Sequence, residues 1–382
     1  MRQKLIPVIA SLFLVPMLFA GPAFAQTGST ASPGLTLNQA VQDALAHNAQ
    51  VSSANTSIQE TQKSLTYLGE TTPSWTPSPV PGNPYVGNPS QYQASINLAQ
   101  SDYANQEAWQ SYNYTKNTVI FNTMSDYFAA QVAGQAIAAA QAGLKYNQSN
   151  YNDTLAEERV GMATQDQVAT AAWNLKQAKT GLTTAENELK NAYTALENDT
   201  GNSVTGQPDL ATAVAYRAGN LFPGLGLDAV TTMAIKTSPQ IFTDQSNVFL
   251  ANEAQDWNQV PGLGPLQALQ DQNKLTTDTQ AVTQAATTAY TALDNARTSY
   301  ETAEKQLTAA NSALAAAKAS LAAGVITNTA YLDAVYQQAQ AQLGVLTALE
   351  GSQPQGYYVA RGNLAVLTGQ GSVLPPAVAN GQ

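Results

Sequence analysis

The sequence predicts a mainly α-helical protein in which a long antiparallel coiled-coil hairpin occurs twice. Two rows of apolar residues run through residues 286–321, each with a spacing of seven, and the rows lie three residues apart. This spacing is typical of a helix that keeps one stripe against a partner helix. Because one row is all alanine, the two backbones can approach closely. The rows are Ala286, Leu293, Tyr300, Leu307, Leu314 and Leu321, and Ala289, Ala296, Ala303, Ala310 and Ala317.

The same pattern of two apolar rows occurs earlier in the chain, in residues 175–196. Its leucines and alanines are again seven residues apart, with the alanines three residues after the leucines. They are Leu175, Leu182, Leu189 and Leu196, with Ala178, Ala185 and Ala192. Two copies of an uncommon pattern indicate a chain built from two structural repeats.

The composition excludes several classes of function. Charged residues make up 11% of the 382 residues, against about 25% in typical soluble domains. The net charge is −10, so nucleic acid is not an expected partner, because phosphate binding needs clustered cations. Cysteine is absent and His47 is the single histidine, which argues against metal centres and a Ser/His/Asp hydrolase. We expect no enzyme, no cofactor and no bound metal.

The scarcity of charges also suggests tolerance of acid. Amides and hydroxyls occupy positions where charges are usual, so protonation of carboxylates removes few favourable interactions. We expect that thermal stability does not fall sharply between neutral pH and about pH 3.

Residues 1–25 have the pattern of a secretory signal peptide. Two basic residues precede an apolar run over residues 5–20, and Ala23-Phe24-Ala25 supplies a small-x-small cleavage site. The run is short for a membrane span and contains two prolines. We therefore expect export, cleavage after Ala25, and a polar linker over residues 26–34.

The first repeat is predicted over residues 35–201. Thr36 and Gln39 can form a capping box at the start of a helix that runs to about Leu68. Residues 71–100 form an insert that begins with a segment rich in proline, glycine and asparagine. Later in the insert, apolar and polar residues alternate over residues 92–98, which predicts one short strand.

Two long helices follow the insert, over residues 101–159 and 165–198. Neither stretch contains proline. Gly161 breaks the helical pattern between them, and Gly201 is a plausible stop for the second helix.

The second repeat is predicted over residues 225–369, between a connector over residues 202–224 and a disordered tail over residues 370–382. The segment that starts at Leu225 mirrors the one that starts at Leu35 with an offset of 190 residues. Gly324 mirrors Gly161 with an offset of 163, and the closing glycines mirror each other with an offset of 168. The offset between the copies falls from 190 to 163 residues, so the second copy is 27 residues shorter between its start and its turn. The insert over residues 71–100 therefore has no counterpart in the second copy.

The order of these motifs resembles the outer-membrane efflux protein family, the TolC-like channel tunnels. The resemblance covers residues 35–369, and no single motif in it is specific. The order and the duplication of the motifs, together with the signal peptide, carry the resemblance. The motifs are Leu35-Thr36-Leu37 with Ala40-Val41 and Ala44-Leu45, then Arg159-Val160-Gly161-Met162-Ala163-Thr164, then Ala323-Gly324-Val325-Ile326-Thr327, and Leu332-Asp333-Ala334.

This resemblance implies a TolC-like α-barrel protomer and a homotrimer whose hairpins close a helical tunnel. The hairpin turns would meet a periplasmic membrane-fusion adaptor and an inner-membrane transporter. Asp333 and Asp166 are the implied candidates for a pore constriction, although Ala330 and Ile326 stand where the family has an acidic and a basic residue. The implied adaptor-contacting residues are Val160, Gly161, Met162, Thr164, Gly324, Val325, Ile326 and Thr327.

The insert departs from the family pattern, in which membrane strands are inserted in each copy. A membrane strand needs about 9–11 residues, whereas the alternating stretch over 92–98 is shorter and follows several prolines. A partial barrel would leave backbone groups unpaired in lipid. We therefore expect reduced or missing β-barrel segments, which leaves membrane association open.

Two functions follow as hypotheses. The first is an exported channel-tunnel component of a tripartite efflux or type I secretion system, a passive conduit in the outer membrane or cell envelope. The alternative is an exported coiled-coil scaffold of the envelope, without a barrel, that binds an adaptor but forms no pore in lipid.

Overall fold

The computed structural model of the chain describes residues 35–71, 89–201, 210, 226–257, 264–351, 356–369 and 373–374. The chain divides into two compact units, Met1–Pro33 and Gly34–Gln382, and every described residue belongs to the second. The predicted signal peptide and the linker lie outside the described residues, as do most of the connector and most of the tail.

The described residues form helices and contain no strand, which confirms the predicted fold class. The helices are α1 (Leu37–His47), α2 (Ala49–Thr71), α3 (Pro89–Arg159), α4 (Gln165–Thr200), α5 (Leu227–Thr237), α6 (Pro239–Trp257), α7 (Gly264–Ala322), α8 (Asn328–Glu350) and α9 (Tyr357–Thr368).

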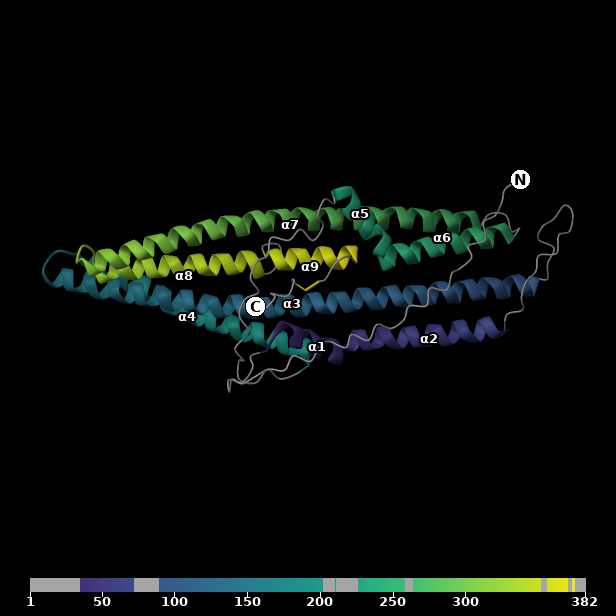
Figure 1. Cartoon of the computed structure of the whole chain (residues 1–382), viewed down its shortest axis with the longest axis horizontal. Coiled ribbons are helices and arrows are strands. Elements are labelled where there is room, and N and C mark those ends of the chain that lie inside the picture. Colours follow the sequence, from purple (N-terminus) through teal and green to yellow (C-terminus); the bar gives the residue numbers. More distant parts are fainter. Residues whose placement is uncertain are drawn as a thin grey trace, which may run out of the picture. The chain divides into compact units, whose positions relative to one another are not determined.

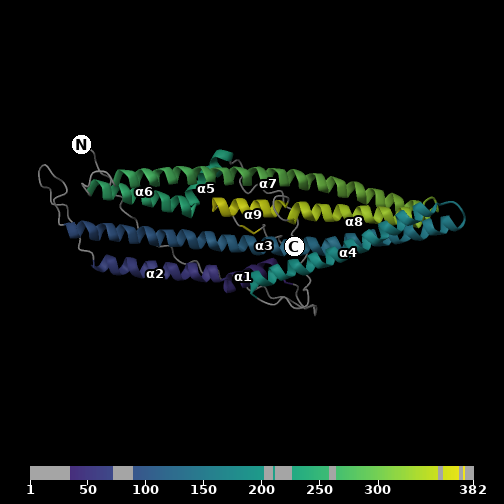
Figure 2. The same ribbon diagram turned by 180° about the vertical axis from the view of Figure 1, so that it is seen from behind.

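The helices form two similar sets, α1–α4 and α5–α9 (Figure 1). In the first set, α2 packs along the N-terminal part of the long helix α3, and α4 packs along its C-terminal part. In the second set, α6 and α8 pack along α7 in the same way. Helix α3 also packs against α8, which joins the sets, and the view from behind shows the same neighbours (Figure 2).

The first helices of the two sets, α1 and α5, are equivalent. Each has 11 residues, and the offset between them is the predicted 190. Ala44 of α1 and Ala234 of α5 occupy equivalent positions and are fully buried. The residues that end the two helices, Asn48 and Ser238, have ψ angles of 118° and 119°. The two copies therefore follow the same backbone path here.

Asn48 shows that the single helix predicted to reach about Leu68 is wrong, because this residue separates α1 from α2. Its backbone is extended, which ends α1. Its Oδ1 accepts hydrogen bonds from the N–H groups of Gln50 and Val51, at 2.9 and 3.1 Å. Such side-chain acceptors satisfy N–H groups that the first turn of a helix leaves free.

The strand predicted over residues 92–98 is also wrong, because these residues lie within α3. Pro89 is the first residue of this helix, where a missing N–H costs nothing and the fixed φ favours helix. The apolar side chains continue at helical spacing, with Ile96, Ala99 and Tyr103 all partly buried. The end of the proline-rich segment therefore starts the helix instead of preceding a strand.

The last helices of the two sets end in equivalent ways. Thr200 and Thr368 are buried. Their hydroxyls donate to the carbonyls of the leucines four residues earlier, at 2.9 and 2.8 Å. The glycines that follow have positive φ, +66° and +61°, and stand against α1 and α5. The equivalent pairs are Leu196 and Leu364, Thr200 and Thr368, Gly201 and Gly369, and the residues that the glycines face, His47 and Thr237.

One difference between the copies explains the two offsets of 163 and 168. Helix α4 is continuous, whereas α8 ends at the cap Gly351 and α9 begins after Gly356. This break accommodates the five additional residues of the second copy.

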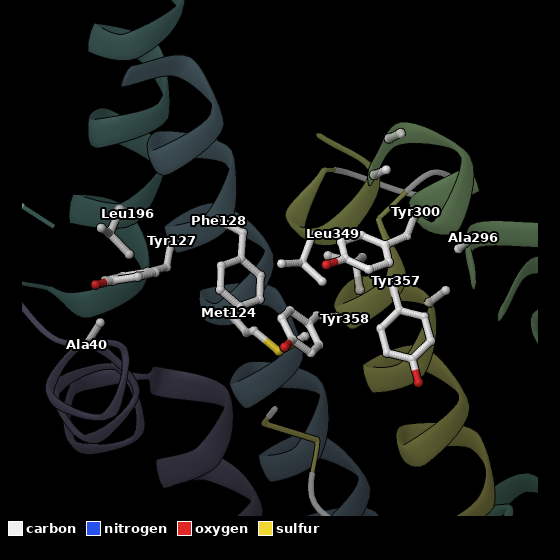
Figure 3. Packing of buried hydrophobic residues seen from close by; sticks show 14 residues of the cluster. Ala40, Met124, Tyr127, Phe128, Leu196, Ala296, Tyr300, Leu349, Tyr357 and Tyr358 are labelled. Carbon is white, nitrogen blue, oxygen red and sulfur yellow. The ribbon is translucent and has the colours of Figure 1, made fainter. Parts of the chain in front are cut away.

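The main core cluster joins both sets (Figure 3). Phe128 of α3 stacks on Tyr358 of α9, with ring centroids 5.9 Å apart. Leu196 of α4 and Tyr300 of α7 belong to the same cluster. The two rows predicted in residues 286–321 are buried or partly buried at every position, which confirms them as the packing stripe of α7.

Candidate functional site

The first hairpin turn joins α3 to α4 and is closed by a regular set of backbone hydrogen bonds. Gly161 has φ +78°, the left-handed conformation that glycine adopts without a Cβ penalty. Its N–H donates to the Glu158 carbonyl at 2.9 Å, and the Met162 N–H donates to the Glu157 carbonyl at 2.8 Å. This pair of bonds is a Schellman motif, which satisfies the last carbonyls of α3.

The second turn, between α7 and α8, repeats this geometry. Gly324 has φ +69°, and its N–H donates to the Leu321 carbonyl at 3.0 Å. The Val325 N–H donates to the Ser320 carbonyl at 2.9 Å. Both glycines therefore lie where the chain reverses, and a Cβ added to either would meet nothing within 4 Å.

The threonine three residues after each glycine starts the next helix. Thr164 forms a complete capping box with Gln167: its N–H donates to Gln167 Oε1 at 2.7 Å, and its Oγ1 accepts from the Gln167 N–H at 3.3 Å. Thr327 Oγ1 accepts from the Ala330 N–H at 3.1 Å. Ala330 has no side-chain oxygen that could accept from the Thr327 N–H, so the second cap lacks the reciprocal bond.

The turns present apolar side chains to solvent. Val160 is 69% exposed, Met162 79% and Val325 76%, which are the three highest values among the large apolar residues described as exposed. Ile326 is partly buried, and Thr164 and Thr327 are exposed. Large apolar side chains exposed at both turns are typical of a protein–protein contact.

The two candidate constriction residues have different surroundings. Asp166 is exposed and, with Glu157, lines an open cavity of about 340 Å³ between α3 and α4. Asp333 is partly buried on α8, and its Oδ1 accepts a hydrogen bond from Gln337 Nε2 at 3.4 Å. The hydrogen bond described for Asp333 and the cavity lined by Asp166 therefore each lie within one hairpin.

Polar contacts between α3 and α8 hold the two hairpins together near their turns. Thr329, two residues after the cap Thr327, contacts Ser149 through hydroxyl oxygens 2.6 Å apart and donates to Asp153. Sequence reasoning missed this group, because the residues are about 180 positions apart and carry no local motif.

An aromatic contact continues the α3–α8 seam. Tyr336 stacks on Tyr146 with centroids 6.3 Å apart and 9° between the planes. The ring also lies over Gly143, where a Cβ would come within 2.8 Å of Tyr336 Cε2. The seam therefore depends on a glycine that has no role in any turn.

In the part of the chain that the structure describes, no helix is both long and apolar enough to cross a lipid bilayer.

Comparison with known proteins links the fold to outer-membrane channels. No protein-family model matches the chain, and no curated protein matches its sequence. Solved structures do match over most of their length. The Campylobacter jejuni CmeC outer membrane channel has a TM-score of 0.62 and 13% identity, with 90% of each chain covered.

Two further structures give similar values. The Neisseria gonorrhoeae MtrE outer membrane channel in its open state has a TM-score of 0.56 and 16% identity, over 87% of this chain and 88% of that one. The Vibrio cholerae outer membrane protein VceC has a TM-score of 0.58 and 12% identity, over 88% and 96%. Together with the duplicated hairpins and their turns, these matches give the chain the fold of TolC-like outer-membrane channels.

Proposed function

We propose that the chain is an exported channel-tunnel subunit, which closes as a homotrimer into a helical conduit of a tripartite efflux or type I secretion system. The observation that carries this proposal is the pair of matching open turns on two equivalent hairpins. Such turns are not needed by a simple spacer rod. The conduit would lie in the outer membrane or cell envelope, would carry small molecules or protein passively, and would perform no chemistry.

The turns are proposed to dock a periplasmic membrane-fusion adaptor, which in turn engages an inner-membrane transporter. Val160, Met162 and Val325 would supply apolar contact area, since they are the side chains most exposed to solvent there. The open space around Gly161 and Gly324 would let a partner approach the backbone. Ile326, Thr164 and Thr327 would complete the surface, the threonines chiefly by holding the turn shape.

Asp333 and Asp166 are proposed to constrict the entrance. In a trimer each would occur three times around the axis, and a ring of carboxylates favours cations over anions. Selectivity would then depend on pore width and on these few charges, while the transporter would provide the energy.

The docking role is testable with a photo-crosslinking amino acid at Met162 or Val325 in cells that contain the adaptor and the transporter. We expect covalent adducts with the adaptor from both positions. The matched control is Leu269, which is 57% exposed near the other end of α7. Adducts from Leu269 alone would contradict the proposal.

The conduit role requires that the chain closes into a trimer and that cargo leaves the cell through it. Chemical crosslinking of the purified protein is expected to give a closed trimer, and deletion of its gene is expected to raise the cellular content of the transporter's cargo. A monomer that still crosslinks to the adaptor would instead support the exported scaffold without a pore.

A further inference from the structure

Each hairpin has a hollow between its two helices, and the two hollows have equivalent walls. The hollow between α3 and α4 has a volume of about 480 Å³, and the hollow between α7 and α8 has about 580 Å³. With the offset of 163 residues, lining residues of the two hollows correspond in pairs, among them Ala140 and Ala303, Gly181 and Gly344, and Ala185 and Ala348. The two hairpins therefore form the same hollow at the same place.

Among the described residues, only the first of these two hollows has a third wall. Tyr336 and Gln340 of α8 line it together with residues of α3 and α4. The Tyr336 ring lies over Gly143 of α3, which is itself a lining residue. The residues that line the second hollow all come from α7 and α8. Gln306, the equivalent of Gly143, is exposed there. The second hollow is thus incomplete in a single chain.

The residues that would complete it are present on α4. This helix is the equivalent of α8, so Trp173 takes the place of Tyr336, and Gln177 takes that of Gln340. Trp173 is 60% exposed, whereas Tyr336 is partly buried and stacks on a tyrosine of α3. Tryptophan is a frequent anchor of protein–protein contacts. Helices α4 and α7 lie at opposite edges of the hairpin pair, with α3 and α8 between them (Figure 1).

We propose that a second copy of the chain completes the hollow between α7 and α8, with its Trp173 and Gln177 in the places that Tyr336 and Gln340 occupy in the first hollow. The α7–α4 contact between copies repeats the α3–α8 contact within one copy. A contact between two different surfaces closes into a ring when the rotation between copies allows it. The inference deepens the proposed function and rests on it for the number of copies, three.

The surface of α7 suits an indole ring. Ala309 is the equivalent of Tyr146, on which Tyr336 stacks, and it is exposed. The smaller alanine leaves room for a ring larger than that of tyrosine. Gln306 stands where α3 has a glycine, but its side chain is exposed and has several rotatable bonds, so it can turn aside.

The equivalence also fixes the register of the contact between copies. Within the chain, the hydroxyl oxygens of Ser149 and Thr329 are 2.6 Å apart, and Gln135 Nε2 donates to Gln342 Oε1 at 3.5 Å. Their equivalents are exposed polar side chains that can hydrogen-bond to each other. The equivalent pairs between copies are Ser312 with Asp166, and Thr298 with Lys179.

The register is testable by thiol crosslinking, because the chain contains no cysteine. The purified full-length mature protein is treated with a short bismaleimide. Ser312→Cys/Asp166→Cys and Thr298→Cys/Lys179→Cys are expected to give covalent trimers on a denaturing gel. The swapped pairs, Ser312→Cys/Lys179→Cys and Thr298→Cys/Asp166→Cys, use the same four positions but place the thiols about 20 Å apart along the helices, so they should link far less. Ser149→Cys/Thr329→Cys should link within one chain and keep the size of a monomer.

Equal linkage by matched and swapped pairs would overturn the proposal. Crosslinking of the unmodified chain through its lysines separates this failure from that of the proposed function. A closed trimer whose matched cysteine pairs do not link would overturn the α7–α4 contact alone. A monomer would overturn both the contact and the proposed conduit.

The role of Trp173 is measured by sedimentation. Trp173→Tyr copies the second repeat and is expected to leave the assembly unchanged. Trp173→Glu is expected to weaken the assembly by about tenfold or more, with the helical circular dichroism retained. Tyr114→Glu is the control, since it makes the same change at an exposed aromatic residue of α3, a helix with neighbours on both sides. Equal effects of the two glutamates would contradict the anchor role of Trp173.

Discussion

At the scale of single residues, four glycines with positive φ define the ends of helices. Gly161 and Gly324 stand in open space, whereas Gly201 and Gly369 stand against side chains of α1 and α5. The same backbone conformation therefore serves two purposes. At the turns it reverses the chain, and at the hairpin roots it also lets one helix end dock closely on another.

Replacement of these glycines separates the two purposes. We expect Gly161→Ala to lower the free energy of unfolding by about 1 kcal/mol, from backbone strain alone. Gly201→Ala should cost more, because its Cβ would lie 2.8 Å from that of His47. Gly134→Ala is the control: this glycine is exposed within α3, so alanine should be neutral or stabilising. Urea unfolding measures all three, and equal losses for the first two would refute the close-docking argument.

At the scale of elements, one buried carboxylate fastens α6 to α7. Asp244 of α6 is 1% exposed, and its Oδ1 lies 2.6 Å from Lys274 Nζ of α7. Lys274 also reaches Asp278, one turn further along α7, at 2.7 Å. Gln240 Nε2 donates to the same oxygen of Asp244 at 3.1 Å. A charge buried in this way is tolerated because it is paired and hydrogen-bonded.

Removal of the lysine should therefore cost more than the loss of an ordinary surface pair. We expect Lys274→Met to lower the free energy of unfolding by clearly more than the loss of an exposed ion pair does, because Asp244 keeps its burial and loses its counter-ion. The matched control is Arg297→Met, which breaks an exposed pair with Glu301 on the same helix and should cost about 0.5 kcal/mol or less. Chemical denaturation at pH 7.5 compares them, and similar costs would show that the burial of Asp244 does not matter.

The seam between α3 and α8 supports a second prediction at this scale. Gly143→Ala places a Cβ against the Tyr336 ring, which stacking on Tyr146 holds in place. We expect a loss of about 1–3 kcal/mol, as for other overpacked sites. Gly181→Ala on α4 is the control, since nothing lies within 4 Å of its added Cβ. In the background Tyr336→Ala the effect of Gly143→Ala should largely vanish, and a full effect there would disprove the contact.

At the scale of the whole molecule, the sequence predicted the duplication and the places where the chain reverses. Heptad spacing and glycine positions are local signals, and the helices and turns follow them. The α3–α8 contacts were not predictable in the same way, because they join residues far apart in sequence. The strand over 92–98 failed because seven alternating residues are too few to compete with a helix that begins at Pro89 and continues for 71 residues.

The equivalence of the two copies gives the last prediction. If both turns are the same Schellman motif, residues 160–163 can be replaced by Ala-Gly-Val-Ile, the sequence of residues 323–326, without a change of backbone. We expect the free energy of unfolding to change by less than about 0.5 kcal/mol, as for other surface substitutions. The control Gly-Ala-Val-Ile moves the glycine by one position, forces alanine into the left-handed conformation and should cost about 1–2 kcal/mol. If the exchange proved as destabilising as this control, the two turns would not be interchangeable, and the molecule would be two different hairpins rather than one hairpin used twice.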